Sequence, residues 1–227
     1  MDNLQQLKSI ILQVGPENVW RPVYAPGNKK LADGIGDQDD GLPPDLSRID
    51  FRGKTVADLG CNFGYYTFMA KQAGAKHVTG IDKDKRIIQG CRILKEMMGI
   101  EDVSFLATDI VQSDGLGTFD TGMMIDFIGK RSVRTGVFKD YLNVLERLSR
   151  KEMILSIRPA YHVKKHLSCD LKALSQKYPG DCIRNDHFYL LEYVLTCFGR
   201  NWQMEIISPA STPPGTKKET LYFKRRN

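Results

Sequence analysis

Four aspartates, each at or near the C-terminal end of an apolar segment, could do chemistry together: Asp58, Asp82, Asp109 and Asp126. The first belongs to the turn Asp58-Leu59-Gly60-Cys61-Asn62-Phe63-Gly64. A glycine turn between a strand and a helix exposes backbone N–H groups to a ligand above it. An acid about twenty residues further along is placed to bind both hydroxyls of a ribose. The pattern predicts a nucleotide cradle with Asp82 on its far side.

Alternating strands and helices must position these acids. Strands are expected at residues 55–57, 103–107, 118–125 and 153–157, and one more strand ends at residue 82. Helices are expected at residues 65–73, 83–98, 131–150 and 188–199. Ligands bind at the C-terminal edge of an open parallel sheet, whereas a carboxylate buried within a strand is costly. Two further strands, 202–207 and 220–224, are joined without a helix, which predicts an antiparallel hairpin.

Two segments lie outside this repeating pattern. Residues 1–50 begin with an amphipathic stripe, predicted to form a helix packed on the sheet or on a second subunit. Residues 16–50 are rich in Pro, Gly and Asp and are expected to form a lid over the cleft rather than strands. The remainder, 51–227, forms the main domain, with an insertion at about 160–187 that has helical pieces around 167–178.

This order of elements resembles the class I S-adenosylmethionine-dependent methyltransferases over roughly residues 51–224. The resemblance implies an α/β fold, a doubly wound, Rossmann-like seven-stranded sheet that is mostly parallel with an antiparallel last strand. It implies S-adenosylmethionine as cofactor. Asn62 stands where the family usually has the middle glycine of the turn, and asparagine tolerates left-handed backbone better than most residues.

The resemblance also assigns site residues. Cofactor contacts are expected from Asp58, Gly60, Cys61, Asn62, Gly64, Asp82, Lys83, Asp109, Ile110 and Asp126. Within this set Asp82 would bind the ribose hydroxyls and Asp109 the adenine amino group, while Asp126 lies nearest the sulfonium and is the catalytic candidate. Alternatively, Asp82 is no more than a helix N-cap and Asp109 caps a turn.

Several acceptor chemistries lose support. No cysteine follows Pro or Thr after the fourth or fifth strand, as a cytosine C5 enzyme would need. Asp126-Phe127-Ile128-Gly129 lacks the two prolines of the amino-methylating enzymes. Asp126 and Glu219 match two positions of the Lys-Asp-Lys-Glu set of ribose 2′-O-methyltransferases. However, Arg158 stands where its central lysine is expected, and an arginine cannot act as a base.

The charge of the chain points to an anionic acceptor. The formal net charge is +6, and cations follow the fourth and fifth strands and precede the last one: Lys130, Arg131, Arg134, Lys164, Lys165, Lys217 and Lys218. A basic rim suits RNA (tRNA or rRNA) or a small anionic metabolite. A dinucleotide-dependent oxidoreductase and a non-catalytic S-adenosylmethionine-binding protein remain alternatives.

The remaining composition favours a cytoplasmic protein. Five scattered cysteines suit reduced thiols, and no apolar run is long enough to span a membrane or resembles an export leader. Neither the histidines nor Asp37, Asp39 and Asp40 have the spacing of metal ligands, so no metal is expected. The sequence leaves the oligomeric state open.

Overall fold

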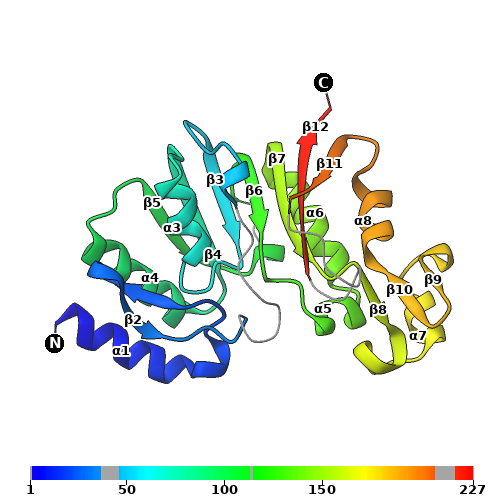
Figure 1. The fold of residues 1–227 in the computed structure, drawn as a ribbon, viewed down its shortest axis with the longest axis horizontal. Coiled ribbons are helices and arrows are strands. Elements are labelled where there is room, and N and C mark those ends of the chain that lie inside the picture. The colour runs from blue at the N-terminus through cyan, green and yellow to red at the C-terminus, as the bar shows by residue number, and fades with distance from the viewer. Residues whose placement is uncertain (1, 37–45, 113–114, 208–217, 227) are drawn as a thin grey trace.

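The computed structural model describes residues 2–36, 46–112, 115–207 and 218–226, and its centre is a seven-stranded sheet with the order β11-β12-β7-β6-β3-β4-β5 (Figure 1). The strands are β3 (Thr55–Leu59), β4 (His77–Asp82), β5 (Val103–Ala107), β6 (Phe119–Met124), β7 (Ser149–Ile157), β11 (Trp202–Ile206) and β12 (Glu219–Arg225). β12 lies between β11 and β7 and runs antiparallel to both, while the other neighbouring pairs are parallel. The predicted sheet and closing hairpin are confirmed.

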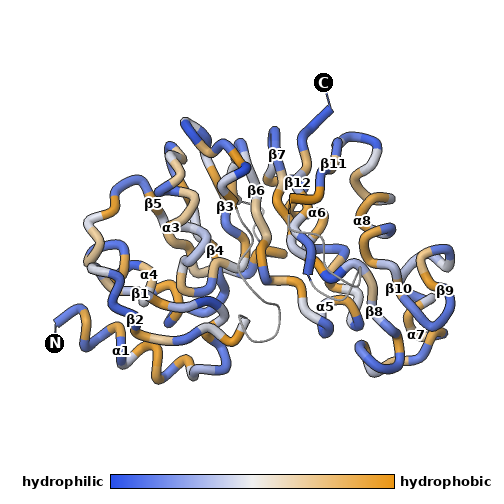
Figure 2. The backbone as a smooth tube through the Cα atoms, viewed as in Figure 1, coloured by the Kyte–Doolittle hydropathy of each residue, from blue (hydrophilic) through white to orange (hydrophobic). Residues whose placement is uncertain are grey.

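Helices cover both faces of the sheet. They are α1 (Asn3–Val14), α3 (Tyr65–Gln72), α4 (Lys85–Met98), α5 (Lys130–Thr135), α6 (Phe138–Leu148) and α8 (Leu190–Phe198). One core cluster joins α1, α3 and α4 to the sheet, and a second joins α5, α6 and α8. Adjacent Val56 and Ala57 of β3 belong to different clusters, as expected for a parallel strand buried on both faces. In Figure 2 the apolar colour runs through β6, β7 and α8.

The structure corrects the helix expected at residues 131–150. Gly136 adopts φ 87° and ends α5, so that α6 starts separately after Val137. The buried residues of α6 are Phe138, Leu142, Val144, Leu145 and Leu148. The amphipathic stripe of α1 packs mainly against α4.

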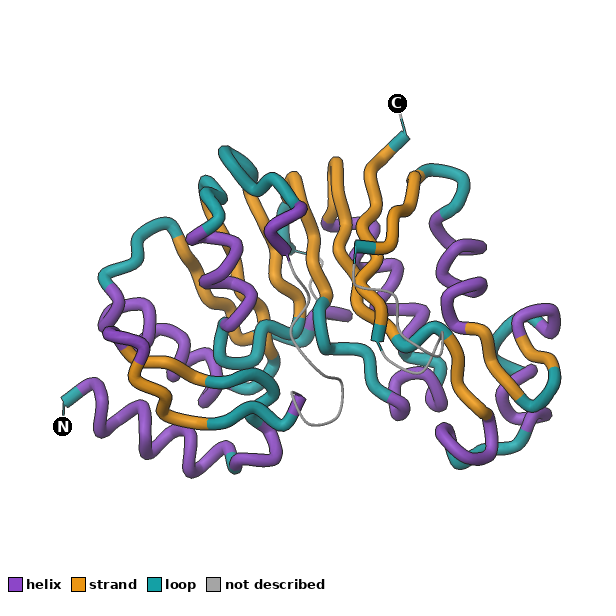
Figure 3. Tube along the Cα trace, in the orientation of Figure 1, coloured by secondary structure: helices purple, strands orange, loops and turns teal. Residues whose placement is uncertain are grey.

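Two segments outside the seven-stranded sheet, residues 16–36 and the insertion at about 160–187, stand on either side of the edge where the parallel strands end (Figure 3). Residues 16–36 contain the hairpin of β1 (Val23–Ala25) and β2 (Lys29–Ala32), so the prediction of a segment without strands is wrong. Asp37, Asp39 and Asp40, at which the sequence analysis expects no metal, lie outside the described residues.

The insertion contains a second sheet that the sequence does not predict. Its strands are β8 (Ala160–His162), β9 (Ile183–Arg184) and β10 (His187–Tyr189), in the order β8-β10-β9. The helical pieces are a π-helix (Val163–Leu167) and α7 (Leu171–Ser175). Phe188 belongs to β10, so α8 starts two residues later than predicted.

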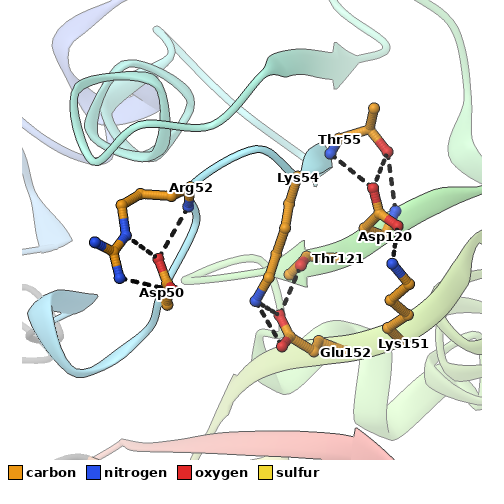
Figure 4. A network of polar contacts seen from close by, with 8 residues as sticks. All are labelled: Asp50, Arg52, Lys54, Thr55, Asp120, Thr121, Lys151 and Glu152. Carbon is orange, nitrogen blue, oxygen red and sulfur yellow. Dashed lines mark hydrogen bonds and ion pairs between the residues drawn. The ribbon is translucent and has the colours of Figure 1, made fainter.

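Polar side chains tie β3, β6 and β7 together at the opposite, N-terminal end of the sheet (Figure 4). Glu152 accepts hydrogen bonds from Lys54 at 2.7 Å and from Thr121 at 2.9 Å. Asp120 accepts from the backbone N–H of Thr55 at 3.0 Å. Because each buried carboxylate accepts hydrogen bonds from neighbouring strands, the cost of its burial is compensated. These contacts hold the three strands together at the end of the sheet opposite the cleft.

Candidate functional site

A cleft of about 1040 Å³ opens at the edge where β3, β4, β5 and β6 end. The predicted site residues that line it are Gly60, Cys61, Asn62, Asp82, Lys83, Asp109, Ile110 and Asp126. Residues from the N-terminal segment, including Trp20 and Arg21, complete one wall, and residues from α5 and the start of the insertion complete another. Its volume is at the upper end of what a small-molecule site needs. The aspartates at the ends of β4, β5 and β6 therefore face one space.

Asp58 and Gly64 do not line the described cleft but support it from behind. Asp58 is buried, with 1% of its surface exposed, and its Oδ2 accepts a hydrogen bond from Thr67 Oγ1 at 2.6 Å. Gly64 adopts φ 80° and is the N-cap of α3. Direct cofactor contact by either residue stays a prediction.

Burial of Asp58 makes the stability of the protein depend on pH. Desolvation raises the pKa of this carboxyl from 3.8 to about 7. The folded state therefore holds a proton that the unfolded chain releases at lower pH, and this stabilising contribution is lost as pH rises through about 7. Between about pH 5 and about pH 8, we expect the free energy of unfolding to fall by roughly 3 kcal/mol relative to Asp58→Asn. Urea unfolding of both proteins at the two pH values measures this difference, and parallel pH dependences would contradict it.

The glycine turn brings backbone against the ring of Phe127. Gly60 has φ 76°, and a Cβ built there would clash with that ring. Asn62 adopts φ 47°, the left-handed backbone that the sequence analysis expects of an asparagine at this position. The turn therefore keeps its shape despite the missing middle glycine.

The side chain of Asn62 has a further task that the sequence does not reveal. Its Oδ1 accepts a hydrogen bond from Trp20 N at 3.1 Å, and its Nδ2 donates to Asn18 O at 2.8 Å. A glycine could make neither bond. The side chain that replaces the family's glycine thus ties the N-terminal segment to the turn.

Asp82 holds the end of β4 beside the turn. Its Oδ2 accepts from Asn62 N at 3.1 Å and its Oδ1 from Asp84 N at 3.0 Å. The N-cap of α4 is Asp84, whose side chain accepts from Arg86 N, so the alternative of Asp82 as that cap is wrong. Desolvation raises the pKa of Asp82, against the effect of the two backbone hydrogen bonds. Each carboxylate oxygen keeps a further lone pair for a ligand hydroxyl.

The residues expected around an adenine lie along the next stretch of the cleft. Asp109 Oδ1 accepts from Val111 N at 3.0 Å, so this side chain does cap a turn while it also lines the cleft. Ile110 is buried and Lys83 is exposed. Cys61 is buried beneath the turn, and desolvation raises the pKa of its thiol.

Asp126 is the centre of a buried ion cluster. Its backbone has φ 58°, and its N–H donates to Ser156 Oγ at 2.7 Å. Its Oδ2 accepts from Arg21 Nε and from Tyr66 Oη, both at 2.6 Å, and its Oδ1 accepts from Lys218 Nζ at 3.5 Å. The side chains of Arg21 and Asp126 are each 4% exposed. The strand end, α3 and the N-terminal segment therefore meet at one carboxylate.

This cluster keeps Asp126 ionised. Desolvation raises its pKa, but the charges of Lys218 and Arg21 together with the hydrogen bond from Tyr66 outweigh it and leave the pKa below its usual value. A carboxylate with a lowered pKa and three donors is a poor general base. The geometry suits positioning more than proton abstraction.

The half of the cleft beyond Asp126 is positively charged. Lys130, Arg131 and Arg158 line it, and none has a carboxylate within 4.0 Å in the part of the chain that the structure describes. Arg158 lies over the ring of Tyr161, 5.9 Å from its centroid. Glu219 does not line this cleft and Arg158 stands in place of the central lysine, so within the described residues the Lys-Asp-Lys-Glu set is not assembled around it.

No group of three or more His, Cys, Asp or Glu side chains among the described residues could hold a metal ion. No helix among them has both the length and the apolar composition needed to cross a membrane.

Comparisons with known proteins agree with this geometry. The family model described as "Methyltransferase domain" matches residues 50–213, and the chain belongs to that family. The ribosomal protein L11 methylase of Lactobacillus delbrueckii shares the fold, with a TM-score of 0.52, 18% identity and coverage of 80% of this chain and 75% of that chain. A magnesium protoporphyrin IX methyltransferase from Synechocystis with bound SAH has a TM-score of 0.51, 19% identity and coverage of 78% and 76%.

Curated relatives match over a short stretch. A ribosomal protein L11 methyltransferase of Shewanella piezotolerans is 37% identical over 71 residues, which are 31% of this chain and 24% of that protein. A tRNA U34 carboxymethyltransferase of Campylobacter hominis is 38% identical over 64 residues, 24% of this chain and 22% of that protein. The chain thus matches about a quarter of the length of these relatives. The predicted class I methyltransferase family, its Rossmann-like fold and S-adenosylmethionine as cofactor are confirmed.

The residues of this chain fit that cofactor. Gly60 and Asp82 both line the cleft, and the Asp82 carboxylate retains acceptor capacity beside the glycine turn. Sequence reasoning missed Tyr66 and placed Arg21 in a lid without a partner. Their link to Asp126 joins positions 60 and 105 residues apart, and no local pattern signals it.

Proposed function

We propose that this protein transfers a methyl group from S-adenosylmethionine to an anionic acceptor, either RNA or a small anionic metabolite. The observation that carries the proposal is a single cleft lined both by the aspartates at the strand ends, Asp82, Asp109 and Asp126, and by Lys130, Arg131 and Arg158, which form no ion pair in the described part of the chain. The names of the relatives point to a ribosomal protein and to a tRNA as acceptors of those proteins. The cations favour the nucleic acid over a protein. The free cysteines support the cytoplasmic location that we propose with it.

When bound, S-adenosylmethionine supplies an electrophilic methyl group that an acceptor atom displaces in line, with release of S-adenosylhomocysteine. Such a displacement needs contact and orientation more than a dedicated base. Asp82, Asp109 and the turn from Gly60 would hold the cofactor. Asp126 would keep Arg21 and Tyr66 in place beside the reacting groups, so its predicted catalytic role becomes one of positioning.

A radiolabelled methyl-transfer assay against cellular RNA and against a metabolite extract tests this function. We expect label in one of the two pools, and loss of label when excess S-adenosylhomocysteine is added. Binding of S-adenosylmethionine without transfer to either pool would favour a non-catalytic binding protein instead. Binding of a nicotinamide dinucleotide in its place would favour the oxidoreductase alternative.

Charge reversal in the acceptor half should separate cofactor binding from acceptor binding. Lys130→Glu with Arg131→Glu is expected to raise the KM for the acceptor at least tenfold, because two cations facing an anion become repulsive. The affinity for S-adenosylmethionine should stay within about twofold. Lys8→Glu with Lys76→Glu, on exposed residues of the other half of the chain, is the matched control. Equal KM values for both double variants would contradict the role of these cations.

A further inference from the structure

A basic face extends from the cleft across α5 and the π-helix of the insertion. It consists of Lys130, Arg131, Arg134, Arg158, Lys164 and Lys165. α5 packs against the π-helix, and Tyr178 Oη donates to Val133 O at 2.7 Å, which fixes α5 to the insertion. Cations from three separate segments of the chain therefore share one surface.

Several other surface arginines of the described residues form ion pairs, whereas these cations form none there. Arg48, Arg52, Arg86 and Arg184 each form an ion pair with a nearby carboxylate. In the described part of the chain no ion pair involves a member of the basic face. Asp170 is an acid close to this face, and its Oδ1 accepts from Ala173 N at the start of α7.

His166 shows that the charges converge. The pKa of this half-buried imidazole lies below its usual value because of desolvation and because of the charges of Arg158, Lys165 and Lys130. Its Nδ1 accepts a hydrogen bond from His162 N at 3.0 Å, which suits a neutral ring. One cation from each of the three segments is thus close enough to His166 to lower its pKa. The basic face is one electrostatic unit.

The extent of the face decides between the two classes of acceptor. Lys130, Arg131 and Arg158 line the cleft, where a small anion would meet all of them. Arg134, Lys164 and Lys165 lie outside that lining and are exposed. A metabolite held in the cleft would leave these three cations without a partner. A polyanion whose chain continues past the cleft would meet both groups.

We infer that the basic face binds the sugar–phosphate backbone of an RNA acceptor next to the nucleotide that enters the cleft. This inference rests on the proposed function and narrows its acceptor to RNA. Phosphate contacts supply affinity and register, while the cleft would select the nucleotide to be methylated. A nucleotide stacked inside a duplex cannot reach such a cleft, so the target would lie in a single-stranded stretch or be flipped out of its duplex.

Fluorescence anisotropy with labelled total tRNA and the full chain tests this inference. In the test variant, Arg134, Lys164 and Lys165 are replaced by glutamate, all outside the cleft lining. We expect its affinity for RNA to fall at least tenfold near physiological salt. The salt slope should become shallower by about two, since each phosphate contact to a single strand contributes about 0.7. S-adenosylmethionine binding, measured by calorimetry, should be unchanged.

The control variant carries Lys8→Glu, Lys29→Glu and Lys76→Glu, which changes the net charge equally at exposed lysines elsewhere. We expect it to lose less than threefold in RNA affinity. Equal losses in both triple variants, or none in the test variant, would overturn the inference. Tighter binding to single-stranded DNA of equal length would overturn the assignment to RNA. If wild-type protein does not bind S-adenosylmethionine, the proposed function itself fails, whatever the RNA result.

Discussion

Asp82→Ala is expected to weaken binding of S-adenosylmethionine at least 100-fold. The variant loses two charge-assisted hydrogen bonds to ribose hydroxyls, which together contribute on the order of 3 kcal/mol. It also releases Asn62 N, which Asp82 Oδ2 holds at 3.1 Å, so the glycine turn loses an anchor. Calorimetric titration of the variant and of wild-type protein measures the change.

Two comparisons make this result specific. Glu101→Ala removes an exposed acid before β5 and should leave the affinity unchanged. Asp82→Asn keeps the shape and one acceptor oxygen, and should recover part of the loss because the turn stays anchored. An affinity of Asp82→Ala within about threefold of wild type would remove Asp82 from the cofactor site.

Arg21→Met is expected to lower the free energy of unfolding by up to about 3–5 kcal/mol, because the buried Asp126 carboxylate loses the nearer of its two cationic partners. The affected charge is Asp126, which is 4% exposed and would keep Tyr66 and Lys218 as partners. The N-terminal segment would lose its contact with the end of β6 and keep the one through Asn62. We therefore also expect faster cleavage of residues 16–36 in limited proteolysis.

Arg52→Met is a matched control, since Arg52 pairs with Asp50 at 2.8 Å on the surface, where the two side chains are 81% and 57% exposed. Exposed pairs of this kind contribute less than about 1 kcal/mol. Denaturant unfolding of both variants gives the comparison. Equal destabilisation by the two substitutions would show that the buried Arg21–Asp126 pair contributes no more to the free energy of unfolding than an exposed pair.

Much of the fold follows from local patterns in the sequence. The apolar composition of the strand that ends at Asp82 matches its burial in the sheet, and Gly99 ends α4 in left-handed backbone as expected. Asp84 as N-cap could have been predicted too, because it directly precedes the helical stripe. The predicted 131–150 helix is wrong because Gly136 ends α5 in left-handed backbone and because β7 already begins at Ser149.

The parts that could not be predicted depend on contacts distant in sequence. The hairpin of β1 and β2 and the small sheet of the insertion consist of strands of two to four residues, too short to show a period. In the sequence, Asn62 only replaces a glycine of the turn, whereas in the structure its side chain makes hydrogen bonds to Asn18 and Trp20. The sequence likewise gives no sign that Asp126 forms an ion pair with Arg21. Both side chains are explained by the N-terminal segment.

The central claim is that one cleft holds the cofactor on its acidic side and the acceptor on its basic side. A crystal structure with S-adenosylhomocysteine tests it most directly. We predict ribose hydroxyls within hydrogen-bond distance of Asp82 and a sulfur atom directed towards the half lined by Lys130, Arg131 and Arg158. An adenosyl group bound outside this cleft, or a sulfur atom directed away from those cations, would contradict the account.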